Sequence, residues 1–336
     1  MMASHRRLSQ TGVISKCNSG LLSLPAQDKY WSTGPMDVSF TNSRAGIASA
    51  RRADTDWATL TNEQRIRSIE LDGYVVIPNL LLAAQLELIR AELCRLPTTA
   101  VDYSEHQRGH SDVQWTDSPN AVSVIALPPM IEFLTTLFGD NLVCTSCAYA
   151  VSEPGHPGIA IHTDAQPYGS KIFGLAASAP CLVRVLYYID DLTPERSPFK
   201  VVPRSHLSLH ADANPYRRYL SHDDEVMVTC QAGSAVIINQ KVFHANYPNY
   251  SDSDRRMLAI AYRPAWAGPI GEVPDHDAER VEKLPPEVRP FFCSLNTRHI
   301  DFDLPNRPDE MSRDAPGISQ RRWGSAPLGQ EESKAS

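Results

Sequence analysis

The sequence predicts a mainly β fold with flanking α-helices, and three observations lead to this fold class. Helical periodicity is confined to residues 61–139, short β-rich segments follow from residue 141, and turn residues separate these segments. Roughly eight short strands after a helical start indicate a β-sandwich or jelly roll with helices on one side. Side chains from distant strands converge in the mouth between the two sheets of a jelly roll.

Three helices are expected in the first part of the chain. The first begins with a capping box of Thr61 and Gln64 and ends at Gly73, before a β-rich segment over residues 74–77. The third covers residues 128–138, where Gly139 ends it. The second is predicted from an apolar stripe on one helical face, which consists of Leu86, Ile89, Leu93 and Leu96.

The strand candidates after residue 140 are bounded by Gly, Pro, Asn and Asp residues, which favour turns. They cover residues 142–151, 158–164, 182–189, 199–202, 225–230, 234–238, 242–245 and 256–262. Within residues 158–164, the alternation of a strand puts His162 and Asp164 on the face opposite Ile159 and Ile161.

The chain of 336 residues is expected to hold one central domain over residues 56–302. Residues 1–55 are Ser-rich and aperiodic, and residues 303–336 are rich in Pro, Arg, Glu and Ser, so both are expected to be poorly ordered. Residues 1–27 contain no acidic residue and are compatible with a transit peptide. A poorly ordered leader is the simpler interpretation, and the cytoplasm is the default location.

Composition argues against several classes of protein. A net charge of −7 disfavours a nucleic-acid binder. No apolar run approaches the roughly 18–20 residues that span a membrane, so no membrane association is expected. The seven cysteines do not suggest a disulfide framework; Cys144 and Cys147, at i and i+3 of a strand candidate, are expected to face opposite ways as reduced packing residues. The oligomeric state is left open.

The pattern His-x-Asp occurs five times, and only one copy lies in a convincing strand. About one match is expected by chance, so most copies are ordinary surface pairs. The segments around the other four are better interpreted as loops or as part of the tail. The five pairs are His110/Asp112, His162/Asp164, His210/Asp212, His222/Asp224 and His299/Asp301.

His162 and Asp164 share a strand face, and His244 on a distant strand candidate can complete a three-point set. Two His and one carboxylate with open positions are typical of non-haem Fe(II) oxygenases. Arg255, which begins the last strand candidate, supplies a permanent cation for the carboxylate of an oxo-acid cosubstrate. Arg256 is the next candidate for that cation, and a turn salt bridge is the alternative role of Arg255.

A rival set exists in the same chain. It combines the pair His110/Asp112 with His206 and Arg217. No predicted strand fixes any of these residues in place, so local context disfavours the rival set.

Five segments between residues 60 and 264 carry a family resemblance. They are Leu60-Thr-Asn-Glu-Gln, Asp72-Gly-Tyr-Val-Val-Ile-Pro78, Leu186-Tyr-Tyr-Ile-Asp-Asp191, Ser197-Pro-Phe-Lys-Val-Val-Pro-Arg-Ser-His206 and His244-Ala-Asn-Tyr-Pro-Asn-Tyr-Ser-Asp-Ser-Asp-Arg-Arg256. In this order and spacing they resemble the phytanoyl-CoA dioxygenase family of Fe(II)/2-oxoglutarate oxygenases. The sequence departs from the family pattern at Ser197 and Arg204, where the family usually has glycine. A third departure is that Ala160 stands where many members have a polar group.

The resemblance implies a double-stranded β-helix (jelly-roll, cupin-like) core and a hydroxylase that uses Fe(II), 2-oxoglutarate and O2. It implies that His162, Asp164 and His244 hold the iron and that Arg255 pairs with the far carboxylate of 2-oxoglutarate. Succinate and CO2 would be released. Halogenases of this kind replace the carboxylate with a small residue, so Asp164 favours hydroxylation or a related oxidation of a C–H bond.

The expected partner is a small-molecule substrate, with a natural-product scaffold, an organic acid or an amino acid among the options. Residues expected near the mouth are Gln166, Tyr168, Arg184 and Trp266. Three alternatives stay open: a metal-binding jelly roll without oxygenase activity (a sensor or inactive relative), a cupin-like enzyme that does not use 2-oxoglutarate, and a thiol redox protein.

Overall fold

The computed structural model describes residues 44–159, 161–162, 182–207, 222–265 and 276–292. Within these residues the strands form a seven-stranded and a three-stranded antiparallel sheet. The larger sheet has the order β1 (Tyr74–Ile77), β8 (Ala235–Asn239), β5 (Val183–Tyr188), β10 (Arg255–Pro264), β4 (Leu142–Ser152), β3 (Ser104–His110) and β2 (Thr99–Val101). The smaller sheet has the order β7 (Val226–Val228), β6 (Phe199–Val202) and β9 (Phe243–Asn246).

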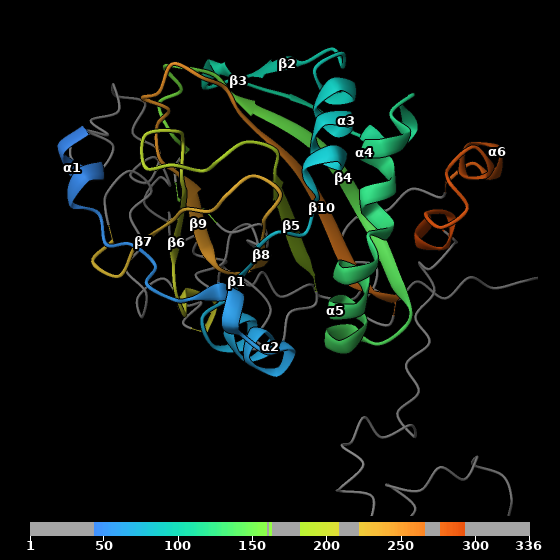
Figure 1. The fold of residues 1–336 in the computed structure, drawn as a ribbon, viewed down its shortest axis with the longest axis horizontal. Helices are drawn as coiled ribbons and strands as arrows, with labels where there is room; N and C mark the ends of the chain where they lie inside the picture. The colour runs from blue at the N-terminus through green and yellow to red at the C-terminus, as the bar shows by residue number, and fades with distance from the viewer. Residues whose placement is uncertain (1–43, 160, 163–181, 208–221, 266–275, 293–336) are drawn as a thin grey trace, which may run out of the picture. The chain divides into compact units, whose positions relative to one another are not determined.

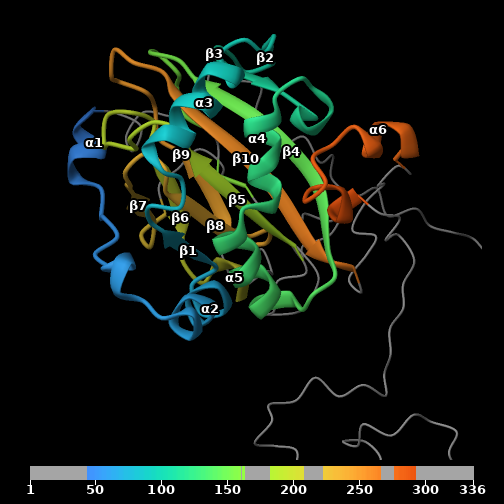
Figure 2. The ribbon, with the colours of Figure 1, turned by 45° about the vertical axis from the view of Figure 1, so that its right-hand side comes forward.

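The two faces of the larger sheet have different partners. Helices α3 (Ala83–Leu93), α4 (Pro119–Ser123) and α5 (Pro128–Phe138) lie over one face (Figures 1 and 2) and share an apolar core with it. The other face, here called the inner face, packs on β6 and β7 through a second core that includes Tyr188, Phe199 and Val236. The fold is therefore mainly β, with a jelly-roll core and helices on one side, as the sequence predicted.

Several elements match the sequence-based boundaries. Thr61 and Gln64 form the expected capping box at the start of α2 (Asn62–Leu71), with backbone-to-side-chain distances of 2.9 and 3.3 Å. Strand β1 and helix α5 also have the predicted bounds. The remaining helices are α1 (Arg44–Ser49) and α6 (Ala278–Glu282), which were not predicted. Of predicted strand 158–164, the structure describes residues 158–159 and 161–162, among which His162 forms a bridge with His244 of the smaller sheet.

The described residues begin at residue 44, so they include part of the segment that the sequence predicted to be poorly ordered. Ile47 of α1 is buried against Met227 of β7 and against Tyr247, the residue after β9. The backbone of Met227 also exchanges hydrogen bonds with Arg51 and Ala53, at 2.8 and 3.0 Å. Residues 44–55 therefore pair with the edge of β7. Their sequence, which is aperiodic, did not indicate this pairing.

Cys144 and Cys147 face the same side of β4, contrary to the expectation from regular alternation. The pairing of β4 with β10 shifts register by one residue between Ala261 and Tyr262, so Thr145 is a bulge. Both cysteines are buried without a disulfide in the core beneath the helices. Burial raises the pKa of the Cys144 thiol to about 12, which keeps it protonated. Their predicted role as reduced packing residues is confirmed, although the argument from opposite faces was wrong.

An apolar stretch, Pro119–Phe138, is long and apolar enough to cross a membrane by composition alone. The prediction that no apolar run approaches this length was therefore wrong for this stretch. In the structure it is broken into α4, a 3-10 turn (Val124–Ala126) and α5. Its side chains, among them Ile125, Met130 and Phe133, belong to the core against the larger sheet. We therefore interpret Pro119–Phe138 as helices of the protein core.

Candidate metal centre

His162 and His244 are directly opposite each other in an antiparallel bridge. Each backbone N–H donates to the other's carbonyl, at 3.0 and 2.9 Å. Opposite residues of an antiparallel pair present their side chains on the same face, and the two imidazole ring centres are 4.5 Å apart. Two imidazoles on one ion, with metal–nitrogen bonds near 2.1 Å, have ligating nitrogens about 3 Å apart, so this separation suits one shared ion.

A backbone contact fixes the tautomer of His244. Its Nδ1 lies 3.0 Å from the carbonyl oxygen of Val242 and therefore donates a proton to it. Nε2 is then the nitrogen that carries the lone pair, as metal-ligating histidines require. The ring also packs on Phe199, with ring centres 5.8 Å apart, so β6 orients the imidazole from the side.

Asp164, the expected third ligand, lies outside the described residues, as do Gln166, Tyr168 and Trp266. Among the residues that the structure does describe, no group of three or more His, Cys, Asp or Glu side chains is placed to hold a metal. The structure thus brings two of the three proposed ligands together, and the third stays a prediction.

Arg255 is fully buried at the start of β10. Its Nη2 donates to the hydroxyl of Ser152 at 2.5 Å, its Nη1 lies 3.7 Å from the sulfur of Met257, and its guanidinium carbon is 5.9 Å from the ring centre of Tyr188. No carboxylate of the described residues is within ion-pair distance of it. Burial lowers the pKa of Arg255, but an arginine remains a cation in proteins. It is therefore a buried charge suited to an anionic ligand.

Ser152 and Gln107 form a polar row with Arg255 across three strands. Ser152 is the register partner of Arg255 on β10 and of Gln107 on β3, so the three side chains share the inner face. Ser152 accepts from the guanidinium and donates to Gln107 Oε1 at 2.5 Å. This row orients the guanidinium without neutralising its charge.

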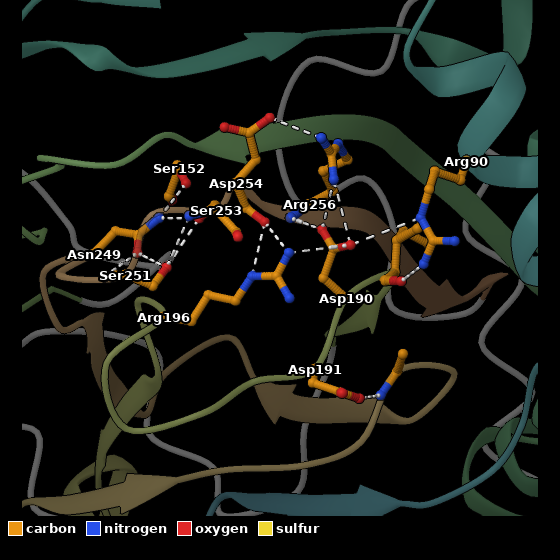
Figure 3. Close-up of polar contacts among 12 residues, drawn as sticks. Arg90, Ser152, Asp190, Asp191, Arg196, Asn249, Ser251, Ser253, Asp254 and Arg256 are labelled. Atoms are coloured by element: carbon orange, nitrogen blue, oxygen red, sulfur yellow. Dashed lines mark hydrogen bonds and ion pairs between the residues drawn. The ribbon is translucent and has the colours of Figure 1, made fainter.

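The loop before β10 is held by side-chain to backbone hydrogen bonds (Figure 3). Asn249 Nδ2 donates to the carbonyl oxygens of Ser152 and Ser253, at 2.8 and 2.9 Å, and its Oδ1 accepts from the backbone of Ser251 at 3.1 Å. Because Asn249 contacts both the loop and the strand residue that binds Arg255, it fixes the start of β10 relative to β4.

Asp190 holds the outward-facing neighbour, Arg256. Its carboxylate accepts from the Arg256 backbone at 2.9 Å and pairs with the side chains of Arg256, Arg196 and Arg90, at 3.2, 3.4 and 3.7 Å (Figure 3). Arg256 also pairs with Asp254 at 2.7 Å. The ion pairs occupy Arg256, the second candidate for the cosubstrate cation. Adjacent strand residues face opposite ways, so this clamp directs Arg255 inward.

The rival ligand set is not brought together. His206 donates from Nε2 to the carbonyl of Glu70 at 2.8 Å, whereas His110 donates from Nδ1 to the carbonyl of Pro97 at 2.8 Å. Arg217 lies outside the described residues. His110 is the last residue of strand β3, so the expectation of a loop there was wrong: a polar sequence forms an edge-side strand because β4 supplies its hydrogen bonds. His222 accepts from the backbone of Asp224 at 3.1 Å, as a loop pair would.

Sequence reasoning missed three buried polar residues near the site. The hydroxyl of Tyr188 and Oδ1 of Asn246 are buried and, within the described residues, have no hydrogen-bond partner. His156 is fully buried between Tyr103 and Ser197, whose hydroxyls are 3.3 and 3.5 Å from its two ring nitrogens. Alternation in the segment 186–191 could have shown that one of its tyrosines faces inward, but the choice depends on register.

Arg184, a proposed substrate residue, lies on the inner face of β5. It is opposite Ala261 of β10, which is in turn opposite Ser146 of β4. Arg184 as a whole residue is partly exposed, although its Nε is buried. Its position at the other end of the inner face from Arg255 is compatible with contact to a substrate.

A known dioxygenase has a similar sequence. The dioxygenase andF of Emericella variicolor is 27% identical over 146 residues, which are 43% of this chain and 50% of that protein. The chain spans about half the length of the curated relatives it matches.

Two solved structures share the fold. One is SnoN, a non-heme α-ketoglutarate-dependent epimerase from nogalamycin biosynthesis (TM-score 0.53, 20% identity, 65% of this chain and 89% of that chain). The other is HygX from Streptomyces hygroscopicus with nickel, 2-oxoglutarate and hygromycin B bound (TM-score 0.52, 19% identity, 61% and 88%). The family model for phytanoyl-CoA dioxygenase (PhyH) matches residues 69–257, which is more than half of the chain. This chain therefore belongs to the phytanoyl-CoA dioxygenase family.

Proposed function

We propose that the protein is an Fe(II)- and 2-oxoglutarate-dependent dioxygenase that oxidises a C–H bond of a small-molecule metabolite. The observation that carries this proposal is the His162–His244 bridge, which pairs two imidazoles on one face. The buried Arg255, with no carboxylate partner among the described residues, supports the cosubstrate. Membership of the phytanoyl-CoA dioxygenase family supports the same assignment.

The residues fit the proposed groups. His162, His244 and Asp164 would hold the iron, with the tautomer of His244 set by the carbonyl of Val242. Two neutral imidazoles and one carboxylate leave a divalent ion with a net positive charge, which favours an anionic chelator. The Nε of Arg255 has no hydrogen-bond partner among the described residues, so it can donate to the distal carboxylate of 2-oxoglutarate. HygX, which has a similar fold, was crystallised with 2-oxoglutarate and a metal.

When bound, the iron supplies the oxidising chemistry: O2 and 2-oxoglutarate are consumed, succinate and CO2 leave, and one oxygen atom enters the substrate C–H bond. The chain itself positions the reactants. Arg255 orients the cosubstrate from one end, the histidines fix the metal end, and Phe199 excludes water beside His244. Hydroxylation is the proposed outcome; SnoN, an epimerase, shows that a related fold supports another.

The inner face carries several small side chains. Ala148, Ala150 and Ala259 lie on this face and are only partly covered, whereas Tyr149 and Leu258 on the other face are buried. Small side chains beside a metal site leave space for a molecule between the sheets. HygX was crystallised with hygromycin B and SnoN comes from nogalamycin biosynthesis, so these similar structures also support a natural-product substrate. The cytoplasmic location and the absence of nucleic-acid and membrane partners stay predictions.

An anaerobic titration tests the proposal. Fe(II) and 2-oxoglutarate are added to the wild-type protein while the visible charge-transfer band of the chelate is followed. We expect the band in the wild type, its loss in Asp164→Ala and His244→Ala, and at least tenfold weaker 2-oxoglutarate binding in Arg255→Ala, because a buried ion pair is lost.

His110→Ala is the matched control, since His110 is a partly exposed histidine bonded to the backbone, and it should keep the band. Loss of the band in His110→Ala but not in His244→Ala would favour the rival set. Iron binding without any 2-oxoglutarate binding in the wild type would favour the metal-binding jelly roll without oxygenase activity.

A further inference from the structure

We propose that the hydroxyl of Tyr188 is a second donor to the carboxylate that Arg255 binds, so that a guanidinium and a neutral phenol grip the distal end of 2-oxoglutarate together. This inference rests on the proposed function and adds a specificity-determining residue to it. Tyr188 was not among the residues that the sequence predicted for the site.

Strand register puts Tyr188 next to Arg255. Tyr188 is the last residue of β5 and lies opposite Met257 of β10. Arg255 is two residues before Met257, so all three side chains share the inner face and Tyr188 is the diagonal neighbour of Arg255. The guanidinium carbon is 5.9 Å from the tyrosine ring centre. The guanidinium therefore lies beside the tyrosine ring on the same face of the sheet.

Both groups have unused donors. Tyr188 and Arg255 are fully buried, yet the tyrosine hydroxyl and the arginine Nε have no hydrogen-bond partner among the described residues. Buried polar groups are partnered in the great majority of cases, and an unpartnered one is costly. A hydroxyl hydrogen and a guanidinium N–H are donors, so what both lack is an acceptor. A carboxylate, with two oxygens and a negative charge, is the acceptor that satisfies both.

A buried hydroxyl without a hydrogen-bond partner does not by itself indicate a ligand. Tyr187, the preceding residue, is also fully buried with an unpartnered hydroxyl in the described structure. It faces the other side of the sheet, in the core beneath the helices, and no arginine or lysine of the described residues influences its hydroxyl as Arg255 does that of Tyr188. The position beside Arg255 therefore distinguishes Tyr188, and Tyr187 provides a matched control on the same strand.

The phenol is in the right protonation state to donate. Burial raises the pKa of Tyr188 above its ordinary value, and the nearby Arg255 lowers it by a smaller amount. The hydroxyl therefore keeps its proton at neutral pH. It adds a hydrogen bond without adding a charge.

The test compares Tyr188→Phe with Tyr187→Phe. Neither hydroxyl has a hydrogen-bond partner among the described residues, so the melting temperature of the ligand-free protein should stay the same or rise in both variants. In the anaerobic Fe(II) titration, Tyr188→Phe should bind 2-oxoglutarate about tenfold more weakly, the size of a lost hydrogen bond to a charged group. Tyr187→Phe should bind it as the wild type does.

A second ligand locates the effect. 2-Oxopentanoate has the same chain length but a methyl group in place of the distal carboxylate, so its affinity should be low and equal in the wild type and in Tyr188→Phe. Unchanged 2-oxoglutarate affinity in Tyr188→Phe would overturn the inference, as would equal losses in both variants. A larger drop in the ligand-free melting temperature for Tyr188→Phe than for Tyr187→Phe would also overturn it, because the hydroxyl would then have a protein partner. If the wild type does not bind 2-oxoglutarate at all, the result would instead contradict the proposed function.

Discussion

Arg255 illustrates at the residue scale how a functional side chain is held at a cost to stability. A buried charge without a counter-ion is unfavourable by several kcal/mol. Here the guanidinium keeps one strong hydrogen bond, to Ser152, and lies near the ring of Tyr188. This environment fixes its direction while leaving its charge unneutralised by the described residues. Binding of a carboxylate would recover part of the cost, which is a physical reason for affinity at this position.

Ser197 and Arg204 show how two family glycines are replaced without loss of the backbone conformation. Both adopt positive φ, 47° and 66°, which is uncommon for residues with a Cβ. Ser197 is anchored by a 2.9 Å hydrogen bond from its hydroxyl to the carbonyl of Tyr247. Arg204 is anchored by its N–H to the carbonyl of Asp72 at 3.0 Å and by a 3.2 Å ion pair with the same residue. Local hydrogen bonds therefore impose a conformation that glycine adopts without strain.

Two substitutions at Arg204 measure this strain. Arg204→Ala and Arg204→Gly both remove the exposed ion pair with Asp72, which contributes at most about 1 kcal/mol. Alanine keeps the left-handed strain of about 1–2 kcal/mol, and glycine relieves it against a smaller entropic cost. We expect Arg204→Gly to be about 1 kcal/mol more stable than Arg204→Ala in urea unfolding. Equal stability would mean that the backbone at 204 is unstrained.

At the scale of elements, the junction between the loop and β10 sets the direction of Arg255. Three arginines, Arg90 from α3, Arg196 and Arg256, converge on the 6% exposed carboxylate of Asp190 at the end of β5. The cluster joins a helix, a loop and two strands. It therefore couples the stability of this end of the sheet to the geometry of the cosubstrate site.

Asp190→Asn should destabilise the protein by about 3 kcal/mol, because the substitution leaves three clustered guanidinium groups with one fewer counter-charge. The neighbouring Asp191→Asn is the control. Asp191 is exposed and accepts one hydrogen bond, from the backbone of Ala232 at 2.8 Å, so its loss should cost about 1 kcal/mol or less. Urea unfolding of both variants checks the difference. Similar losses in both would show that the arginine cluster contributes little to stability.

Elements with strong local signals were predictable from sequence, and those that depend on tertiary pairing were not. The capping box of α2, the Gly139 stop of α5 and the apolar strand β6 need no knowledge of their neighbours. Strand β3 was missed because its polar sequence is extended by pairing with β4. The bulge at Thr145 depends on the register with β10 in the same way. Alternation predicts which residues share a face only where no bulge intervenes.

At the scale of the whole domain, the candidate site is divided between two sheets. His244 belongs to the smaller sheet and packs on Phe199, while Arg255 and Tyr188 belong to the larger sheet. Phe199 and Tyr188 meet in the core between the sheets. Sequence spacing could propose His162, His244 and Arg255 because each has a distinctive chemistry. Tyr188 could not be proposed in this way, since its role follows from packing across strands that are distant in the chain.

The pH dependence of global stability should report the buried His156. Burial, followed by the charges of Arg255 and His106, lowers the pKa of His156 in the folded protein to about 3 from its usual 6.5. The unfolded chain therefore binds a proton near pH 6.5 that the folded protein excludes until about pH 3. Stability is complete above pH 6.5 and falls as the pH decreases, by up to about 1.4 kcal/mol per pH unit.

Replacing His156 with a residue that does not titrate should reduce the loss of stability at acid pH. We expect the free energy of unfolding of His156→Gln, measured in urea at pH 8, 6 and 5, to decrease less on acidification than that of the wild type. The comparison at pH 8, where both side chains are neutral, gives the effect of the substitution on packing alone. Parallel curves for the two proteins would show that His156 accepts its proton in the folded state, and thus that water or an anion reaches the interior beside Arg255.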